Sequence, residues 1–224
     1  MVTFIIAGLI AGVNPKEMPS SILFITIAVN AAMWIVIMAV IIPKLGLPEN
    51  IHLKTKECIK HYFIGLGLMY LTMIFMGILL QLSNYQPQTQ EVASQIIIMG
   101  KENIFLALIG PAILIPVIEE FLFRSVLYRS IKVSLSPLIA ALISAGVFGL
   151  VHGEFDVIPQ LIALGLVFTY IYEKSGSIMV ASALHATNNS VAIIFMIYGP
   201  EIVEWLQATE KQLQSAGFGL LISG

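Results

Sequence analysis

The chain has 224 residues, of which 58% are hydrophobic and 11% are charged, and its formal net charge is −2. Soluble domains carry about 25% charged residues, so this composition excludes an ordinary soluble protein and predicts one that crosses a membrane several times. The sequence has no basic stripe that would bind a nucleic acid, and a single cysteine, Cys58, excludes an internal disulfide.

Apolar runs separated by proline, glycine and charged residues predict the membrane helices. In chain order, these runs are residues 21–42, 62–82, 103–123, 137–151, 157–172 and 178–198. The segment Met1–Val13 is shorter than the roughly 20 residues of a full span and lacks the basic start of a signal peptide. We expect it to form a partial helix or to lie at the interface. The predicted fold is all-α, a polytopic transmembrane bundle of about six to eight helices.

The predicted organisation has three parts. Residues 1–102 hold N-terminal membrane helices and a basic loop, residues 103–198 hold a helical core with polar motifs, and residues 199–224 form a C-terminal tail. The tail includes Trp205 and is partly amphipathic, which favours a place in the membrane interface. Residues 81–102 are polar and are expected to form a loop.

Most of the cations fall on one side when successive loops are assigned to alternate sides of the membrane. That side collects Lys44, Lys54, Lys56, Lys60, Arg124, Arg129, Lys132 and Lys174, and the other has Lys16, Lys101 and Lys211. Cytoplasmic loops are enriched in Lys and Arg, so the first side is predicted to be the cytosol. Cys58 then lies in a cytosolic loop as an ordinary free thiol.

The first polar motif is EEFLFR, residues 119–124, at the end of an apolar run. Glu120 and Arg124 are four residues apart, which favours an ion pair on one helical face. Glu119 points about 100° away from Glu120, so it can face a cavity and act as a general base. The alternative is a structural ion pair with a second acid at the membrane edge, although intramembrane acids are costly and often functional.

The second motif is FGLVH, residues 148–152, in which Phe148 and His152 share a helical face. Alone, it is more typical of an interfacial histidine bonded to a backbone carbonyl. The predicted spans place His152 near the external end of its helix, whereas Glu119 lies toward the cytosolic half. A shared site therefore requires His152 to lie deeper than these spans indicate.

The third motif is HATNN, residues 185–189, where His185 and Asn189 project together. Both side chains can donate hydrogen bonds to an oxyanion. The alternative is helix–helix hydrogen bonding, which is worth about 0.6 kcal/mol per contact in membranes. Asn188 points to a different face and is given no role.

The three motifs are most informative together. Each comes from a separate apolar helix, and buried polar groups must satisfy one another, so we predict that they meet at one site. The other two histidines, His52 and His61, are assigned to the basic loop. The sequence has neither an HExxH zinc motif nor a GxSxG elbow, so attack by an activated water is the favoured hydrolytic chemistry.

The ordered set EExxxR, FxxxH and HxxxN resembles the CAAX protease and bacteriocin-processing family of intramembrane proteases, also called the type II CAAX prenyl endopeptidase-like or Abi family. The resemblance covers residues 119–189. It implies that Glu119 and His152 activate water, that His185 and Asn189 hold the oxyanion, and that the site is supported by Glu120, Arg124 and Phe148. It also implies a multi-pass protein of the cell membrane that cleaves a membrane-anchored peptide or protein.

No cofactor is expected, with Zn²⁺ as the alternative. Two glutamates, two histidines and an asparagine are possible ligands, and zinc sites are compact sets of such side chains. A single histidine on each helix and the neighbouring Arg124 argue against a dication. The sequence leaves open a metal-dependent protease, a non-catalytic bacteriocin immunity or peptide-binding protein, and a carrier, although the internal repeats typical of carriers are not visible.

Overall fold

The computed structural model describes residues 19–44, 55–83, 91–153 and 155–215, and within these ranges the chain is helical and has no strand. Met1–Val13, His52 and Lys54 lie outside the described residues. Four described helices are long and apolar enough to cross a membrane, and two shorter apolar helices accompany them. The predicted all-α, multi-pass membrane fold is confirmed.

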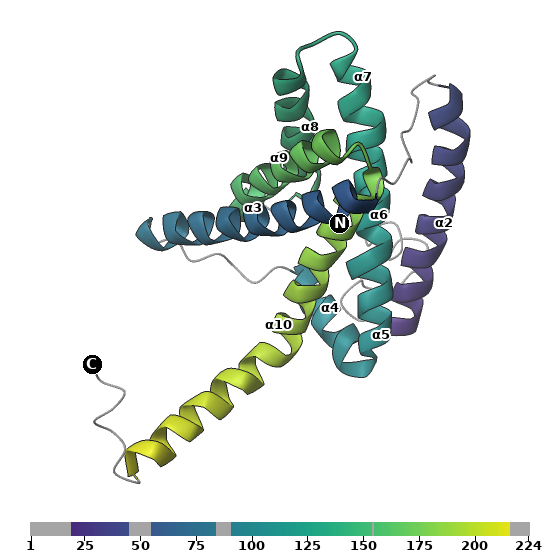
Figure 1. Ribbon diagram of the computed structural model, residues 1–224. Coiled ribbons are helices and arrows are strands. Elements are labelled where there is room, and N and C mark those ends of the chain that lie inside the picture. Colours follow the sequence, from purple (N-terminus) through teal and green to yellow (C-terminus); the bar gives the residue numbers. More distant parts are fainter. Residues whose placement is uncertain (1–18, 45–54, 84–90, 154, 216–224) are drawn as a thin grey trace.

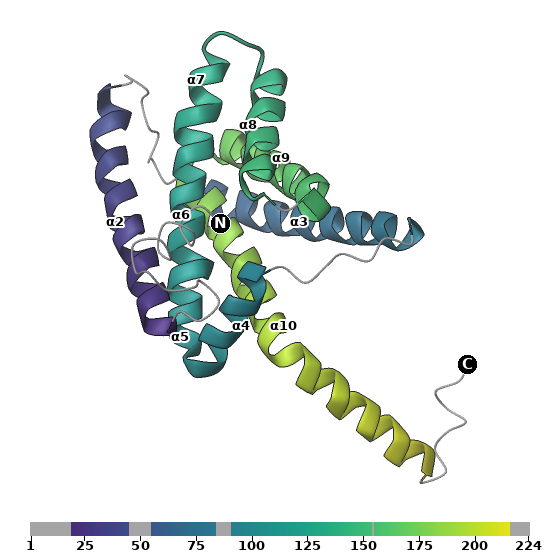
Figure 2. The same ribbon diagram turned by 180° about the vertical axis from the view of Figure 1, so that it is seen from behind.

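The N-terminal part contains α2 (Ser20–Lys44), α3 (Thr55–Leu82) and α4 (Glu91–Glu102). Figures 1 and 2 show α2 alongside the column formed by α5 to α7, and α3 at a steep angle to both. Two predictions were wrong here. Helix α3 begins before the predicted start, so Cys58 and His61 lie in a helix rather than a loop. Helix α4 occupies much of the predicted loop, because its Met99 is buried against Ile197 and other apolar residues.

The central column is one helical path with two changes of register. It consists of α5 (Ile104–Ala107), η2 (Leu108–Leu114), α6 (Ile115–Glu120), η3 (Phe121–Tyr128) and α7 (Arg129–Lys132). The Asn103 side chain caps its start by accepting from the Phe105 N–H at 3.1 Å. Both η segments are π-helical, and such segments occur often at functional sites. The column places the EEFLFR motif directly at the second register change.

The remaining helices are α8 (Pro137–Val151), α9 (Ile158–Ser175), which follows the short turn η4 (Phe155–Val157), and α10 (Ile178–Leu213). Ser136 caps α8 by accepting from the Ile139 N–H, and Gly176, with φ of 64°, ends α9 in the left-handed conformation. Helix α10 continues beyond the predicted end at Tyr198, so residues 199–213 are helical. The interfacial location of the tail stays a prediction.

Two apolar clusters hold the bundle together. One joins α2, α4, α5 and α10 and includes Leu23, Met99 and Ile193. The other joins α3, α9 and α10 and includes Met69 and Phe168. Helices α8 and α9 pack closely against each other. The candidate site lies where the central column, α8, α9 and α10 meet between the two clusters.

Candidate active site

A cavity of about 260 Å³ lies between the central column and helices α4, α8, α9 and α10. Its polar residues are Glu119, His152, His185, Asn188 and Asn189. The rest of its lining is apolar and comprises Ala93, Ile96, Pro111, Ile115, Phe148, Leu161, Leu164, Phe168, Ala192, Ile193 and Met196. The four residues predicted to be catalytic, Glu119, His152, His185 and Asn189, therefore line one hollow.

Glu119 lies between the two histidines. Its Oε1 is 3.8 Å from His152 Nε2, and its Oε2 is 3.7 Å from His185 Nε2. His152 Nδ1 lies 2.7 Å from the Phe148 carbonyl oxygen, which can only accept, so Nδ1 carries a proton. The Nε2 atom of His152 is left to face the carboxylate. The Glu119 side chain is 22% exposed, so the carboxylate is open to the cavity.

His152 directly follows the last residue of α8, as predicted, but this helix is short. Helix α8 has 15 residues and is about 22 Å long, which is shorter than a hydrocarbon core of about 30 Å. Gly153, with φ of 70°, turns the chain directly after His152. His152 therefore lies about as far from the α7–α8 turn as Glu119 does, and not at the external end of a full span.

Behind Glu119 is a buried charged cluster of Glu120, Arg124 and His185. Glu120 and Arg124 are both fully buried and form the predicted ion pair, with Oε1 and Nη1 3.0 Å apart. The same Oε1 lies 2.9 Å from His185 Nδ1. Because an ionised carboxylate only accepts hydrogen bonds, Nδ1 of His185 is the donor and Nε2 points toward Glu119. Arg124 also donates to the Gly165 carbonyl at 3.0 Å, which ties the cluster to α9.

Aromatic rings form the wall around this cluster. The Arg124 guanidinium lies 4.8 Å from the Phe148 ring centre and 5.4 Å from that of Phe168. The Phe148 ring meets His152 at 4.8 Å, and Phe168 stacks on His185 at 4.7 Å with an interplanar angle of 22°. The sequence indicated Phe148 but not Phe168, because one aromatic residue in an apolar run carries no distinguishing signal.

The two asparagines of α10 lie side by side at the cavity. Asn189 Nδ2 donates to the Pro111 carbonyl at 3.4 Å, and Asn188 Nδ2 donates to Asn189 Oδ1 at 3.2 Å. Asn188 was predicted to have no role because it lies about 100° around the helix from Asn189. This prediction was wrong about the location of Asn188. The cavity is wide enough for both adjacent residues of α10 to line it.

The donors that face the cavity bear on the Zn²⁺ alternative. Within the described ranges, no group of three or more His, Cys, Asp and Glu side chains is arranged to hold one. The Nδ1 atoms of both site histidines are hydrogen-bonded, which leaves their Nε2 atoms facing Glu119, an arrangement that is also common in metal sites. The Arg124 guanidinium behind Glu120 adds a positive charge that disfavours a dication. Independence from a metal ion stays a prediction.

These features define a class: a helical membrane protein with an acid–imidazole site inside its bundle. Comparison with known proteins agrees. Residues 101–191 match the Rce1-like family, described as Type II CAAX prenyl endopeptidase Rce1-like. Residues 101–191 thus resemble a CAAX protease domain of the Rce1-like family, and the chain is a membrane peptidase.

Two relatives illustrate this kinship. The membrane-embedded CAAX protease MroQ of Staphylococcus aureus (strain USA300) is 28% identical over 179 residues, which cover 75% of this chain and 71% of MroQ. YdiL of Bacillus subtilis (strain 168), provisionally named a membrane peptidase, is 27% identical over 115 residues, which cover 51% of this chain and 47% of YdiL. No solved structure matches the chain significantly.

Proposed function

We propose that the chain is an intramembrane endopeptidase that hydrolyses a peptide bond of a membrane-anchored peptide or protein by direct attack of water. The observation that carries this proposal is the position of Glu119, whose two carboxylate oxygens face the Nε2 atoms of His152 and His185 at 3.8 and 3.7 Å. The mostly apolar lining of the adjoining cavity suits a substrate that arrives from lipid rather than from water.

The gap between Glu119 and His152 suits a water molecule. A water that bonds to both groups at about 2.8 Å spans the 3.8 Å separation with an angle of about 85° at its oxygen. In this mechanism Glu119 takes a proton from the water as the water oxygen attacks the carbonyl carbon of the substrate, and His152 holds the water in place. Glu119 then returns the proton to the departing amine as the C–N bond breaks.

The negative oxygen of the tetrahedral intermediate needs hydrogen-bond donors, and His185 and Asn189 are the candidates. His185 already gives its Nδ1 proton to Glu120, so it can donate from Nε2 only when both ring nitrogens carry protons. The carboxylates of Glu119 and Glu120 face opposite edges of this ring. Glu120 and Arg124 hold the ring and balance the charge behind it.

Substitution of Glu119 tests the proposal. Glu119→Gln keeps the shape of the side chain but removes the base, so cleavage should fall by at least ~100-fold while folding is unchanged. We would incubate the purified protein in nanodiscs with a library of membrane-anchored peptides and identify the products by mass spectrometry. Glu102→Gln, an exposed acid on α4, is the matched control. Full cleavage by Glu119→Gln would refute the assigned role.

Chelation tests the proposed independence from metal. If the chemistry uses only side chains and water, dialysis against a zinc chelator leaves the turnover rate within about twofold of its starting value. The same protein is then assayed with added Zn²⁺, and its metal content is measured by mass spectrometry. Loss of cleavage on chelation, together with recovery on addition of stoichiometric Zn²⁺, would favour the metal-dependent alternative.

A further inference from the structure

Asn188 and Asn189 form a short hydrogen-bonded chain that ends on the central column. Asn188 Nδ2 donates to Asn189 Oδ1 at 3.2 Å, and Asn189 Nδ2 donates to the Pro111 carbonyl at 3.4 Å. Both asparagines line the cavity that contains Glu119. The proposed mechanism uses Asn189 and leaves Asn188 without a task.

The contacts of the two asparagines define which amide donates each hydrogen bond. The oxygen and nitrogen of an asparagine amide are distinguished by what they contact. The Pro111 carbonyl can only accept, so the NH₂ edge of Asn189 must face it. The oxygen of Asn189 then faces Asn188, which must present its own NH₂ edge. Each step follows from the previous one, starting from a main-chain atom that cannot change its role.

The Pro111 carbonyl, which accepts the hydrogen bond from Asn189, is left available by the sequence of η2 and α6. The Ile115 N–H donates to the Gly110 carbonyl, which is an i to i−5 bond of π-helical register. In that register the donor for the Pro111 carbonyl would be residue 116. That residue is Pro116, which has no N–H. The Pro111 carbonyl is therefore open to a donor from outside the helix, and Asn189 supplies it.

We propose that Asn188 is a positioning residue: by donating to Asn189 Oδ1, it adds a second contact to the one with Pro111, and the two together keep the NH₂ edge of Asn189 toward Pro111 and the reacting carbonyl. One hydrogen of that NH₂ group bonds to the Pro111 oxygen, and the other remains for the oxyanion. If the amide flipped, its oxygen would face the developing negative charge and repel it. This inference rests on the proposed function, because it assigns a second support to the oxyanion donor Asn189.

The test compares three substitutions at residue 188. Asn188→Leu and Asn188→Ala remove the donor, and Asn188→Asp keeps the shape but replaces the donor with an acceptor. One oxyanion donor is worth about 10²–10³ in kcat, so partial loss of its orientation should lower kcat by roughly 10-fold or more, with KM within about twofold. For Asn188→Asp, the ratio of mutant to wild-type kcat should rise as pH falls, since a protonated carboxyl can donate again.

A tetrahedral inhibitor provides an independent readout. Affinity for a phosphinic peptide should fall in Asn188→Leu by about the same factor as kcat/KM. Substrate affinity, measured in the inactive Glu119→Gln background, should not change. A kcat equal to wild type in Asn188→Leu, a rise in KM alone, or loss of folding in all three variants would overturn the inference. If Glu119→Gln is inactive and Asn188→Leu has wild-type kcat, only the inference about Asn188 is refuted. An active Glu119→Gln variant would refute the proposed function itself.

Discussion

Arg124 is a full positive charge with no exposed surface, inside a helix that is apolar enough to cross the membrane. An unpaired charge there would be costly. Its compensation comes from three sources: the Glu120 carboxylate at 3.0 Å, the Gly165 carbonyl at 3.0 Å, and the faces of the Phe148 and Phe168 rings. The residue thus links the central column to α8 and α9, and it holds the carboxylate that orients His185.

Removing one partner of this ion pair should lower the free energy of unfolding far more than replacing both partners. Arg124→Met leaves Glu120 buried without its cation and is expected to lower the free energy of unfolding by about 3–5 kcal/mol. The double variant Glu120→Gln/Arg124→Met should be more stable than the single Arg124→Met variant, because no uncompensated charge remains. Both can be measured by unfolding in mixed detergent micelles.

A second ion pair serves as the control for that experiment. Lys132 and Glu173 also interact, but their side chains are 35% and 34% exposed. Lys132→Met should therefore cost at most about 1 kcal/mol. Equal losses for Arg124→Met and Lys132→Met would contradict the argument from burial.

At the residue scale, sequence reasoning located the residues of the three motifs but not the other residues that line the site. Glu120 and Arg124 were predicted to pair because residues four apart lie next to each other on one face of a helix. Phe168 and Asn188 were missed for a different reason. Their contacts depend on how α9 and α10 approach the central column, and neither helical spacing nor residue type determines that approach.

At the scale of elements, the apolar runs predicted α8 with its observed bounds but misjudged α3, α4, α10 and the end of the central column, which continues past residue 123 to Lys132. The bounds of α8 follow from local signals, since Ser136 and Pro137 start the helix and Gly153 follows its end. Helix α4 has no such signals and depends on burial of Met99. The two π-helical segments of the central column were not predicted either, because their bonds change register without altering the hydrophobic pattern.

The packing of α8 on α9 depends on a glycine. A Cβ atom at Gly165 would lie 3.1 Å from the Cβ and 3.2 Å from the Cα of Ala145. Gly165→Ala should therefore push the helices apart, lower the free energy of unfolding by about 1–3 kcal/mol, and reduce cleavage, because Phe148 and His152 lie on α8. Thermal unfolding and turnover would be measured together.

Gly146, on the same helix as Ala145, is the matched control. A Cβ atom there would meet nothing within 4 Å. Gly146→Ala should leave turnover unchanged and alter stability by no more than about 1 kcal/mol, in the stabilising direction expected for alanine in a helix. The packing argument fails if Gly165→Ala behaves like Gly146→Ala in both measurements.

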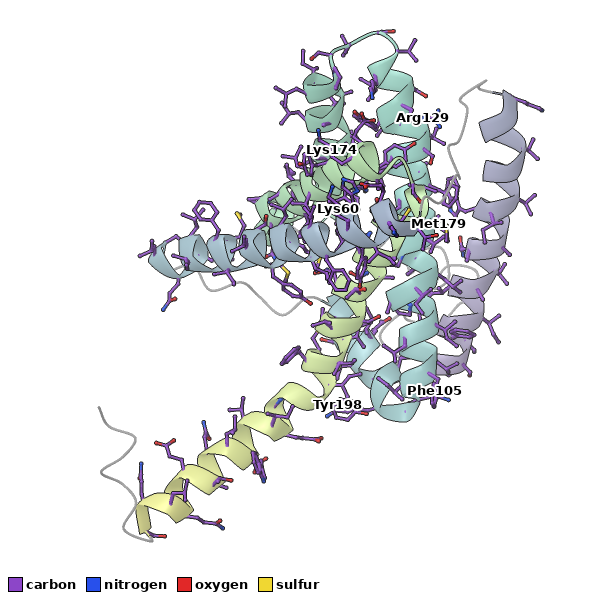
Figure 3. The ribbon with its side chains drawn as sticks, in the orientation of Figure 1. Lys60, Phe105, Arg129, Lys174, Met179 and Tyr198 are labelled. Atoms are coloured by element: carbon purple, nitrogen blue, oxygen red, sulfur yellow. The ribbon has the colours of Figure 1, made fainter. Side chains whose placement is uncertain are left out.

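At the scale of the whole molecule, the cationic helix ends gather at one pole. Figure 3 shows Arg129 and Lys174 in the upper part of the molecule, and Phe105 and Tyr198 in the lower part. The Lys132–Glu173 ion pair connects the end of α7 to the end of α9. Because Lys and Arg favour the cytoplasmic side, this pole should face the cytosol. The Glu119 site would then be about 20 Å from that pole, at 1.5 Å per residue from Lys132.

This orientation can be tested by cysteine labelling, because Cys58 is the only native cysteine. In a Cys58→Ser background, single cysteines would be placed at Ser134, in the exposed turn between α7 and α8, and at Glu102, exposed at the end of α4. The 29-residue column between them is about 43 Å long, enough to put them on opposite sides of a bilayer. A membrane-impermeant maleimide added to intact cells should label Glu102→Cys, whereas Ser134→Cys should react only in inverted vesicles. The opposite pattern would place the cationic pole outside, and labelling of both in intact cells would mean that the column does not span the membrane.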